Sequence, residues 1–167
     1  MFVEHHPNSP PPSSPQQATA AEAAGCTQDL QFPPGGPVGD TRGCRVLVVD
    51  DNRDAADSLA LLLPLWGHAV RVAYDGPAAL EAVRAYRPEV VLLDLGLPGM
   101  TGYEVAGRLR REPGLEKVVL VAVSGYGQEA DRRRTRGAGF RDHLVKPVDP
   151  GDLRQLLAGL CPAAGTP

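Results

Sequence analysis

Hydrophobic positions divide the chain into two parts with different patterns. From residue 44 onward, short apolar runs alternate with stretches in which apolar side chains recur every three or four positions. The first pattern is typical of strands and the second of amphipathic helices. The predicted strands are 45–49, 69–73, 90–94, 118–123 and 142–145, and the predicted helices are about 54–66, 77–86, 103–111, 128–136 and 150–160.

The first, third and fourth of these strands are continuously apolar rather than alternating. A strand of this kind is buried on both faces, as in a parallel sheet that helices cover on each side. Successive strand–helix units require right-handed crossovers, so the sequence predicts a doubly wound α/β domain with a five-stranded parallel sheet and five helices. Pro64 lies inside the first predicted helix and should kink or shorten it.

Residues 1–43 lack both patterns. They contain eight of the seventeen prolines, and they carry four acidic side chains against one arginine. Such a segment cannot bury enough apolar surface to offset its ordering entropy. We therefore expect a disordered tail or linker at 1–43, a folded domain at 44–161 and a flexible C-terminus at 162–167.

Charge, hydropathy and cysteine spacing exclude several classes of protein. The remainder of the chain holds sixteen basic and sixteen acidic side chains, which provides no basic stripe for nucleic acid. No apolar run approaches the roughly 20 residues that cross a bilayer, and the first ten residues do not resemble a secretion signal. We expect a cytoplasmic protein without nucleic-acid or membrane partners. Cys26, Cys44 and Cys161 are odd in number and widely spaced, which suggests neither a disulfide framework nor a zinc site.

Polar side chains stand where four of the predicted strands end, the edge at which open parallel sheets bind ligands. They are Asp50, Asp51, Asp94, Ser124 and Lys146. Taken singly, each has an ordinary explanation. The run Asp50-Asp51-Asn52 would be a helix N-cap cluster, Asp94 and Ser124 would be turn residues, and Lys146 would be a solvated side chain. These explanations do not account for their joint placement at one edge.

Three carboxylates close together stay ionised only when a cation compensates their charge. Oxygen ligands with an incomplete shell suit Mg²⁺, which retains water and is completed by phosphate oxygens. A carboxylate beside Mg²⁺, an ammonium and a hydroxyl can accept a phosphoryl group, because the cations neutralise the transferring oxygens while the carboxylate attacks in line.

Four segments resemble the receiver domain of two-component response regulators: VLVVDDN (46–52), VVLLDLGLPGMTGYE (90–104), VAVSGYG (121–127) and DHLVKP (142–147). The resemblance covers about residues 44–160 and implies a chemotaxis-regulator-like fold with the flavodoxin-like strand order 2-1-3-4-5. It implies that Asp94 is the phosphoacceptor, with Lys146 and Ser124 binding phosphoryl oxygens, and that the peptide before Pro147 is cis. The implied Mg²⁺ ligands are Asp50, through a water, Asp51, Asp94 and the backbone carbonyl of Gly96.

The resemblance also implies a biochemical role. The domain would take its phosphoryl group from a histidine kinase or a histidine phosphotransfer protein. It would then change the surface of its fourth helix, fifth strand and fifth helix to signal to a downstream protein. It would not be a conventional enzyme, since it catalyses only its own phosphorylation and slow hydrolysis. Because only CPAAGTP follows the last helix, a free-standing regulator is expected, and the terminal receiver of a hybrid kinase stays open.

Two features depart from the family or lie outside its pattern. The family usually has Tyr or Phe three residues before the lysine, as a rotamer switch that responds to Ser124. His143 stands at that position, and its imidazole is polar and titrates near neutrality. The predicted helix 128–136 carries four arginines, which form either a solvated face or a docking surface for an acidic partner.

Two other functions stay open. A phosphorylation-independent docking module would use the same fold without the chemistry. A haloacid-dehalogenase-like phosphatase also has an acid after an apolar strand, but it needs a second Asp two residues later, where this chain has Gly96. A nucleotide-binding fold is disfavoured because no glycine-rich phosphate motif follows the first strand.

Overall fold

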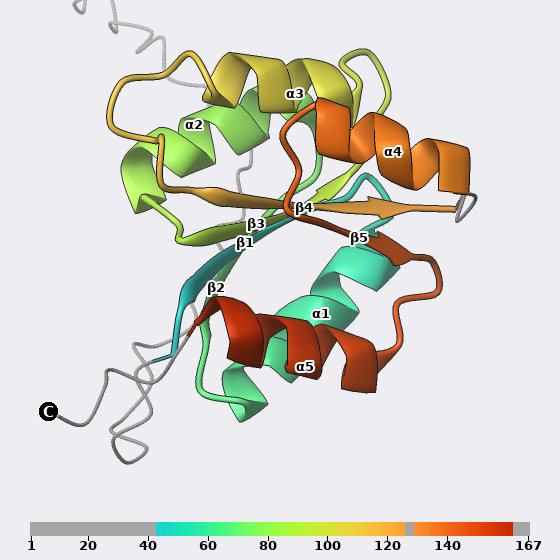
Figure 1. Cartoon of the computed structure of the whole chain (residues 1–167). Coiled ribbons are helices and arrows are strands. Elements are labelled where there is room, and N and C mark those ends of the chain that lie inside the picture. The colour runs from blue at the N-terminus through green and yellow to red at the C-terminus, as the bar shows by residue number, and fades with distance from the viewer. Residues whose placement is uncertain (1–42, 126–128, 162–167) are drawn as a thin grey trace, which may run out of the picture. The chain divides into compact units, whose positions relative to one another are not determined.

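The computed structural model describes residues 43–125 and 129–161, in which strands and helices alternate along the chain (Figure 1). The strands are β1 (Arg45–Val49), β2 (Ala69–Ala73), β3 (Val90–Asp94), β4 (Val119–Ser124) and β5 (Asp142–Val145). The helices are α1 (Arg53–Leu65), α2 (Gly76–Tyr86), α3 (Gly102–Leu109), α4 (Glu129–Gly137) and α5 (Pro150–Leu160). The predicted types and order of these elements are confirmed. Gln128, the predicted start of the fourth helix, lies outside the described residues.

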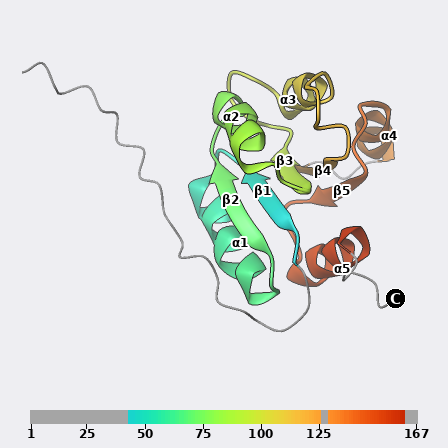
Figure 2. The same ribbon diagram turned by 90° about the vertical axis from the view of Figure 1, so that its left-hand side faces the viewer.

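The strands form one parallel sheet in the order β2-β1-β3-β4-β5, which confirms the predicted doubly wound, flavodoxin-like α/β fold. Helices α1 and α5 cover one face, and α2, α3 and α4 cover the other (Figures 1 and 2). Each face has its own core: along β1, Leu47 and Val49 pack toward α2 and α3, while Val46 and Val48 pack toward α1 and α5. Successive strand side chains point to opposite faces, so a strand buried on both sides is apolar throughout.

The start of each of four helices is fixed by a polar side chain that accepts backbone N–H groups. Asn52, Asp75 and Asp149 do this for α1, α2 and α5. At α3, Thr101 and Glu104 form a reciprocal capping box. These caps satisfy donors that have no partner within the helix, and they fix where each loop at the carboxyl edge of the sheet gives way to a helix.

Pro64 lies within the last turn of α1, and the helix ends one residue later. Proline has no N–H for the carbonyl four residues earlier, and its ring crowds that carbonyl. After Pro64, the N–H of Trp66 bonds to the nearer carbonyl of Leu63 at 3.1 Å, a tightened final turn. The expected shortening is therefore a helix end at Leu65.

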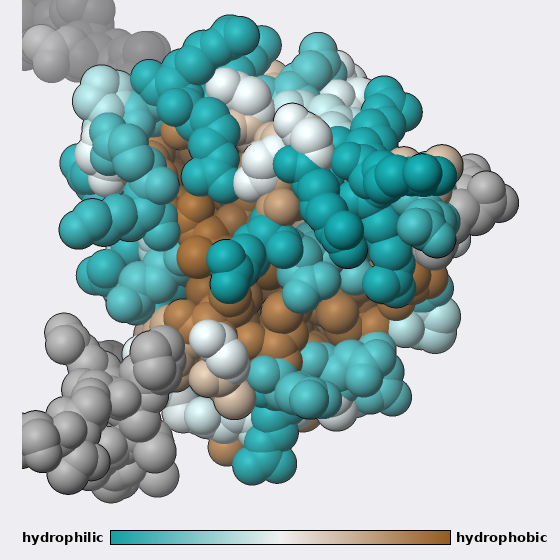
Figure 3. Space-filling model, in the orientation of Figure 1, coloured by the Kyte–Doolittle hydropathy of each residue, from teal (hydrophilic) through white to brown (hydrophobic). Residues whose placement is uncertain are grey.

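Some apolar surface stays uncovered by the helices. The space-filling view shows a band of apolar side chains between the polar side chains of α4 and α5, over the edge of the sheet that β5 forms (Figure 3). Within the described part of the chain, none of the helices has the length and apolar character that crossing a bilayer requires.

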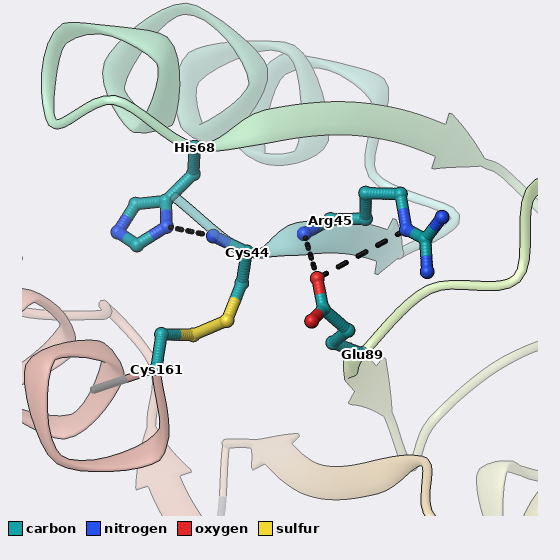
Figure 4. The surroundings of a disulfide bond; sticks show 5 residues. All are labelled: Cys44, Arg45, His68, Glu89 and Cys161. Atoms are coloured by element: carbon teal, nitrogen blue, oxygen red, sulfur yellow. Dashed lines mark hydrogen bonds and ion pairs between the residues drawn. A yellow bond between two sulfur atoms is a disulfide. The ribbon is translucent and has the colours of Figure 1, made fainter. Parts of the chain in front are cut away.

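A disulfide joins Cys44 to Cys161, which corrects the expectation that the cysteines form no disulfide (Figure 4). The two Cα atoms are 5.8 Å apart although 117 residues separate them in sequence. Cys44 precedes β1 and Cys161 caps α5, and α5 packs on the β1 face of the core. Beside the bond, the N–H of Cys44 donates to Nδ1 of His68 at 3.2 Å. The pairing depends on this long-range packing, for which cysteine spacing alone gave no signal.

Residues 1–42 and 162–167 lie outside the described ranges. The disordered tail and the flexible C-terminus therefore stay predictions. The described strands and helices run from Arg45 to Leu160, and the domain bounds 44–161 stay a prediction as well.

Candidate functional site

Three carboxylates gather where β1 and β3 end. Asp50 and Asp51 follow β1, Asp94 is the last residue of β3, and ligand oxygens of all three lie within 4.8 Å of one another. Val49 is paired with Leu93 in the sheet, so Asp50 and Asp94 leave the two strands at the same level. Both of these acids are buried, whereas Asp51 is exposed.

The helix cap that follows β1 is Asn52, not either of the two acids. The side chain of Asn52 accepts the N–H of Ala55 at 3.2 Å, and its own N–H donates to Oδ1 of Asp50 at 3.0 Å. The explanation of the run Asp50-Asp51-Asn52 as a helix N-cap cluster is therefore confirmed for Asn52 and wrong for Asp50 and Asp51. Their carboxylates face the cluster instead, with Asp50 fixed by its neighbour's backbone.

Lys146 joins two of the three acids. Its Nζ lies 2.6 Å from Oδ2 of Asp94 and 2.7 Å from Oδ2 of Asp50. Burial disfavours the charge on Nζ, but the hydrogen bonds that Nζ donates to Asp50 and Asp94 outweigh this, so the pKa of Lys146 is raised above its usual value. The lysine therefore stays an ammonium at neutral pH. The peptide from Lys146 to Pro147 is cis, as expected.

The charge and chemistry of this cluster fit Mg²⁺. Three carboxylates and one ammonium carry a formal charge of −2. Carboxylate oxygens are the hard ligands that Mg²⁺ prefers, and a site with few protein ligands leaves positions for water or phosphate oxygens. A divalent cation would neutralise the remaining charge.

Two glycines shape the surroundings of Asp94. The N–H of Gly96 donates to Oδ1 of Asp94 at 2.8 Å, and a Cβ at Gly96 would lie 3.5 Å from the same oxygen. A larger side chain there would stand beside the carboxylate. At Gly102, an added Cβ would overlap the backbone carbonyl of Asp94, so the start of α3 requires glycine. Sequence reasoning missed this role of Gly102, whose signal is a glycine at the first position of a helix.

The hydroxyl of Ser124 and Nε2 of His143 are hydrogen-bonded at 2.7 Å, and both side chains are buried. His143 pairs with Ala122 in the sheet, two residues before Ser124, so the two side chains lie on the same face of neighbouring strands. The ends of these strands are also joined by the N–H of Lys146, which donates to the carbonyl of Ser124 at 2.8 Å. A displacement of Ser124 would therefore reach both His143 and Lys146. Part of the loop after Ser124, residues 126–128, lies outside the described residues.

The sequence predictions and the geometry agree in part. Asp50, Asp51, Asp94 and Lys146 come together, and Ser124 meets His143 as one pair beside them. Gly96 is also adjacent to Asp94, but through its N–H. The role of its carbonyl as a metal ligand stays a prediction.

A family model described as the response regulator receiver domain matches residues 46–158. A 14.6 kDa protein of Leptolyngbya boryana is 37% identical over 116 residues, which is 70% of this chain and 88% of that protein. The DNA-binding response regulator MtrA of Mycobacterium tuberculosis is 40% identical over 114 residues, 68% of this chain but only 49% of MtrA.

A solved structure of the receiver domain of sensor histidine kinase PA1611 from Pseudomonas aeruginosa is also similar. It has a TM-score of 0.65 and 26% sequence identity, and the match covers 71% of this chain and 98% of that one. In that structure a magnesium ion is coordinated in the active-site cleft.

Proposed function

Because this chain belongs to the response regulator receiver domain family, we propose that it is the phosphoacceptor module of a two-component phosphorelay. It takes a phosphoryl group from a phosphohistidine donor onto Asp94. The donor is a histidine kinase or a histidine phosphotransfer protein. The observation that carries this proposal is the ammonium of Lys146, which bridges Asp94 and Asp50 beside the exposed Asp51.

Asp94 is the acceptor because its surroundings suit a carboxylate that gains a phosphoryl group. A carboxylate oxygen of Asp94 attacks phosphorus, a new O–P bond forms, the P–N bond to the donor imidazole breaks, and the electron pair leaves with that nitrogen. Lys146 now donates to Oδ2 of Asp94, and the transferred phosphoryl oxygens become its acceptors. A Cβ at Gly96 would lie 3.5 Å from Oδ1 of Asp94, so glycine at this position keeps a side chain away from the carboxylate that the donor approaches.

Mg²⁺ is the cofactor that this acidic site would hold, through Asp50, Asp51, Asp94 and the carbonyl of Gly96. When bound, it supplies positive charge to the transferring phosphoryl oxygens. Asp50 and Asp94 are buried and fixed by backbone N–H groups, so their oxygens need no reordering. The same residues release the phosphoryl group slowly to water, and the domain acts on no other substrate. Gly96 stands where a haloacid-dehalogenase-like phosphatase needs its second acid, which argues against that function.

Ser124 and His143 are the switch that reports the modification. The hydroxyl of Ser124 is now engaged with His143, and phosphorylated Asp94 competes for the same hydroxyl. When Ser124 turns to a phosphoryl oxygen, the imidazole loses this bond and adjusts. The change reaches β5 and its neighbours α4 and α5, the face that signals to a downstream protein. We place this exchange in the cytoplasm, without nucleic-acid or membrane partners.

The test is incubation with a small-molecule phosphodonor and Mg²⁺, followed by intact-mass measurement and peptide mapping. One acid-labile phosphoryl group should be found, on Asp94. Asp94→Asn should abolish it, whereas the matched control Asp131→Asn, on α4, should leave it unchanged. A phosphoryl group that persists in Asp94→Asn would overturn the assignment. A phosphorylation-independent docking module would show no modification in any of the three proteins.

A further inference from the structure

Three side chains from α1 and the end of β2 are bound to one another. The guanidinium of Arg53 lies over the ring of Tyr74, with Cζ 4.0 Å from the ring centre. The hydroxyl of Tyr74 donates to Oδ1 of Asp57 at 2.7 Å. Arg53 and Asp57 are one turn apart on α1, which lies beside the edge strand β2 (Figure 2). Helix α1 therefore holds Tyr74 at two points, through its ring and through its hydroxyl.

This group lies at the same edge of the sheet as the acidic site. Arg53 follows Asp51 by two residues, so their Cα atoms are at most about 7.6 Å apart. On the neighbouring strand, Tyr74 directly follows Ala73, whose carbonyl accepts the N–H of Asp50 at 3.2 Å. The guanidinium of Arg53 therefore borders the acidic site on its β2 side.

Helix stability does not account for an arginine at this position. Arg53 is the first residue of α1, where the helix dipole disfavours a cation. The residue is exposed. In the described part of the chain, the ion pairs are made by three other basic side chains, Arg45, Arg84 and Lys146. The ring of Tyr74 restricts the guanidinium without neutralising it, because the ring attracts a cation but has no net charge. A fixed positive charge therefore faces solvent beside the acidic site.

We propose that Arg53, positioned by Tyr74, is the residue that attracts the anionic phosphoryl group of the donor to the acidic site. A guanidinium suits this role because it pairs with phosphate oxygens through parallel hydrogen bonds. Arg53 acts before the transfer and takes no part in making or breaking the bonds to phosphorus. The inference rests on the proposed function, since it concerns the donor that phosphorylates Asp94.

The charge of the acidic site explains why a further cation is needed. The three carboxylates and Lys146 carry a formal charge of −2, so with Mg²⁺ bound the total is zero. A neutral site does not attract an anion from a distance. Lys146 is already paired with Asp50 and Asp94, whereas Arg53 is outside these pairs. One cation roughly 10 Å from a dianion raises its local concentration about threefold in water of low ionic strength.

The test compares two small-molecule donors of different charge. Acetyl phosphate is a dianion at neutral pH, and phosphoramidate is a monoanion. Phosphorylation of the full chain is followed by intact mass at saturating Mg²⁺ and low salt, and the initial rate is plotted against donor concentration. Arg53→Gln should lower the slope about threefold for acetyl phosphate and about half as much for phosphoramidate. Both differences should vanish in about 1 M salt, where the Debye length is only ~3 Å.

Further variants separate charge from position. Arg53→Lys keeps the charge and should keep most of the slope. Tyr74→Leu removes the ring but not the charge, and should lower the slope by less than Arg53→Gln does. Equal slopes in wild type and Tyr74→Leu would overturn the positioning role of the ring.

The matched control is Arg71→Gln. Arg71 is also on an aromatic ring, 4.9 Å from the centre of Tyr86, but it lies within β2, three residues before Tyr74. This places it about 10 Å farther from the carboxyl edge. Its removal should change the slope less than about 1.5-fold. A loss as large as that of Arg53→Gln would show that only net charge matters and would overturn the inference.

Stability and hydrolysis distinguish recognition of the donor from damage to the site. In Arg53→Gln, the free energy of unfolding and the rate at which phosphorylated Asp94 loses its phosphoryl group should match the wild type, because water carries no charge. A slope that falls equally for both donors, or at every salt concentration, would indicate a structural role and overturn the inference.

The same experiment separates the inference from the proposed function. If Asp94 is modified at the same slope in wild type and Arg53→Gln, the proposed function stands and the inference alone fails. If no phosphoryl group appears on Asp94 of the wild type with either donor, both fail.

Discussion

The hydroxyl of Ser124 lies 2.7 Å from Nε2 of His143, so a side chain that ends β4 is bound to one that belongs to β5. Ser124→Ala removes this bond and should leave Asp94 able to accept phosphate, while the amide shifts that phosphorylation causes in α4 and β5 become smaller. His143→Tyr should restore the usual aromatic at this position and enlarge them. The measurement compares amide spectra of the three proteins before and after phosphorylation. Identical shift changes in wild type and Ser124→Ala would show that no such switch operates.

Alanine variants of Asp50 and Asp51 should differ in how they affect Mg²⁺ affinity and the free energy of unfolding. Asp51 is exposed, so Asp51→Ala should lower Mg²⁺ affinity by about tenfold while leaving the free energy of unfolding within about 0.5 kcal/mol of wild type. Asp50 is buried and paired with Lys146, so Asp50→Ala should also lower stability, by about 1–3 kcal/mol. Mg²⁺ titrations followed at the Gly96 amide and urea unfolding give the two quantities. Equal Mg²⁺ affinity in wild type and Asp51→Ala would contradict the ligand assignment.

Gly102 and Gly107 lie on the same helix and should respond oppositely to alanine. A Cβ at Gly102 would overlap the carbonyl of Asp94, so Gly102→Ala should lower the free energy of unfolding by about 2 kcal/mol or more. Nothing lies within 4 Å of a Cβ at Gly107, so Gly107→Ala should raise it by about 0.5–1 kcal/mol. Urea unfolding of both variants tests this, and a loss of equal size in both would refute it.

Reduction of the Cys44–Cys161 disulfide should destabilise the domain. The bond closes a loop of 117 residues, and a cross-link of this span restricts the unfolded chain, by about 2–5 kcal/mol in typical cases. Thermal unfolding with and without reductant measures the loss. Cys44→Ser should have the melting temperature of the reduced wild type, and reductant should not change it. In the control Cys26→Ser, reductant should lower the melting temperature as it does in the wild type. An unchanged melting temperature on reduction would count against a stabilising role.

Lys146 should make stability fall at high pH. Its folded-state pKa is raised by Asp50 and Asp94, so its stabilising contribution is complete below its usual pKa of 10.5 and is lost as pH rises through the raised value. Tyr74 and Tyr86, whose pKa values are also raised, contribute in the same range, so the comparison is with Lys146→Met, which keeps both tyrosines. The free energy of unfolding should fall less steeply above pH 10.5 in that variant. Parallel curves would show that the ion pairs contribute nothing.

The fold was predictable because its signals are local and repeated. Continuous apolar runs predicted strands buried on both faces, and Leu47 and Val48 do pack on opposite sides of β1. The joint placement of Asp50, Asp94 and Lys146 followed from a general property of parallel sheets, whose carboxyl ends share one edge. The order of strands and polar residues along the sequence was therefore enough to predict that these three side chains lie close together.

Other features depend on contacts that no local pattern carries. Cys44 and Cys161 meet only because α5 packs beneath β1, and the Ser124–His143 bond depends on the register of β4 and β5. Asn52 is the helix cap within the run Asp50-Asp51-Asn52, and the sequence pattern alone does not show which of the three residues accepts the N–H of Ala55. The need for glycine at Gly102 arises from the approach of α3 to the end of β3, which is a tertiary contact.

The disulfide also decides how the domain would carry mechanical tension. Cys44 stands before β1 and Cys161 directly after α5, so the bond joins the two ends of the described run of strands and helices. A pull on the chain from both sides would pass from one cysteine to the other through the sulfur atoms. While the bond is intact, the tension bypasses the sheet, so β1 is not sheared against β2 and β3. After reduction the same pull would act on β1 first.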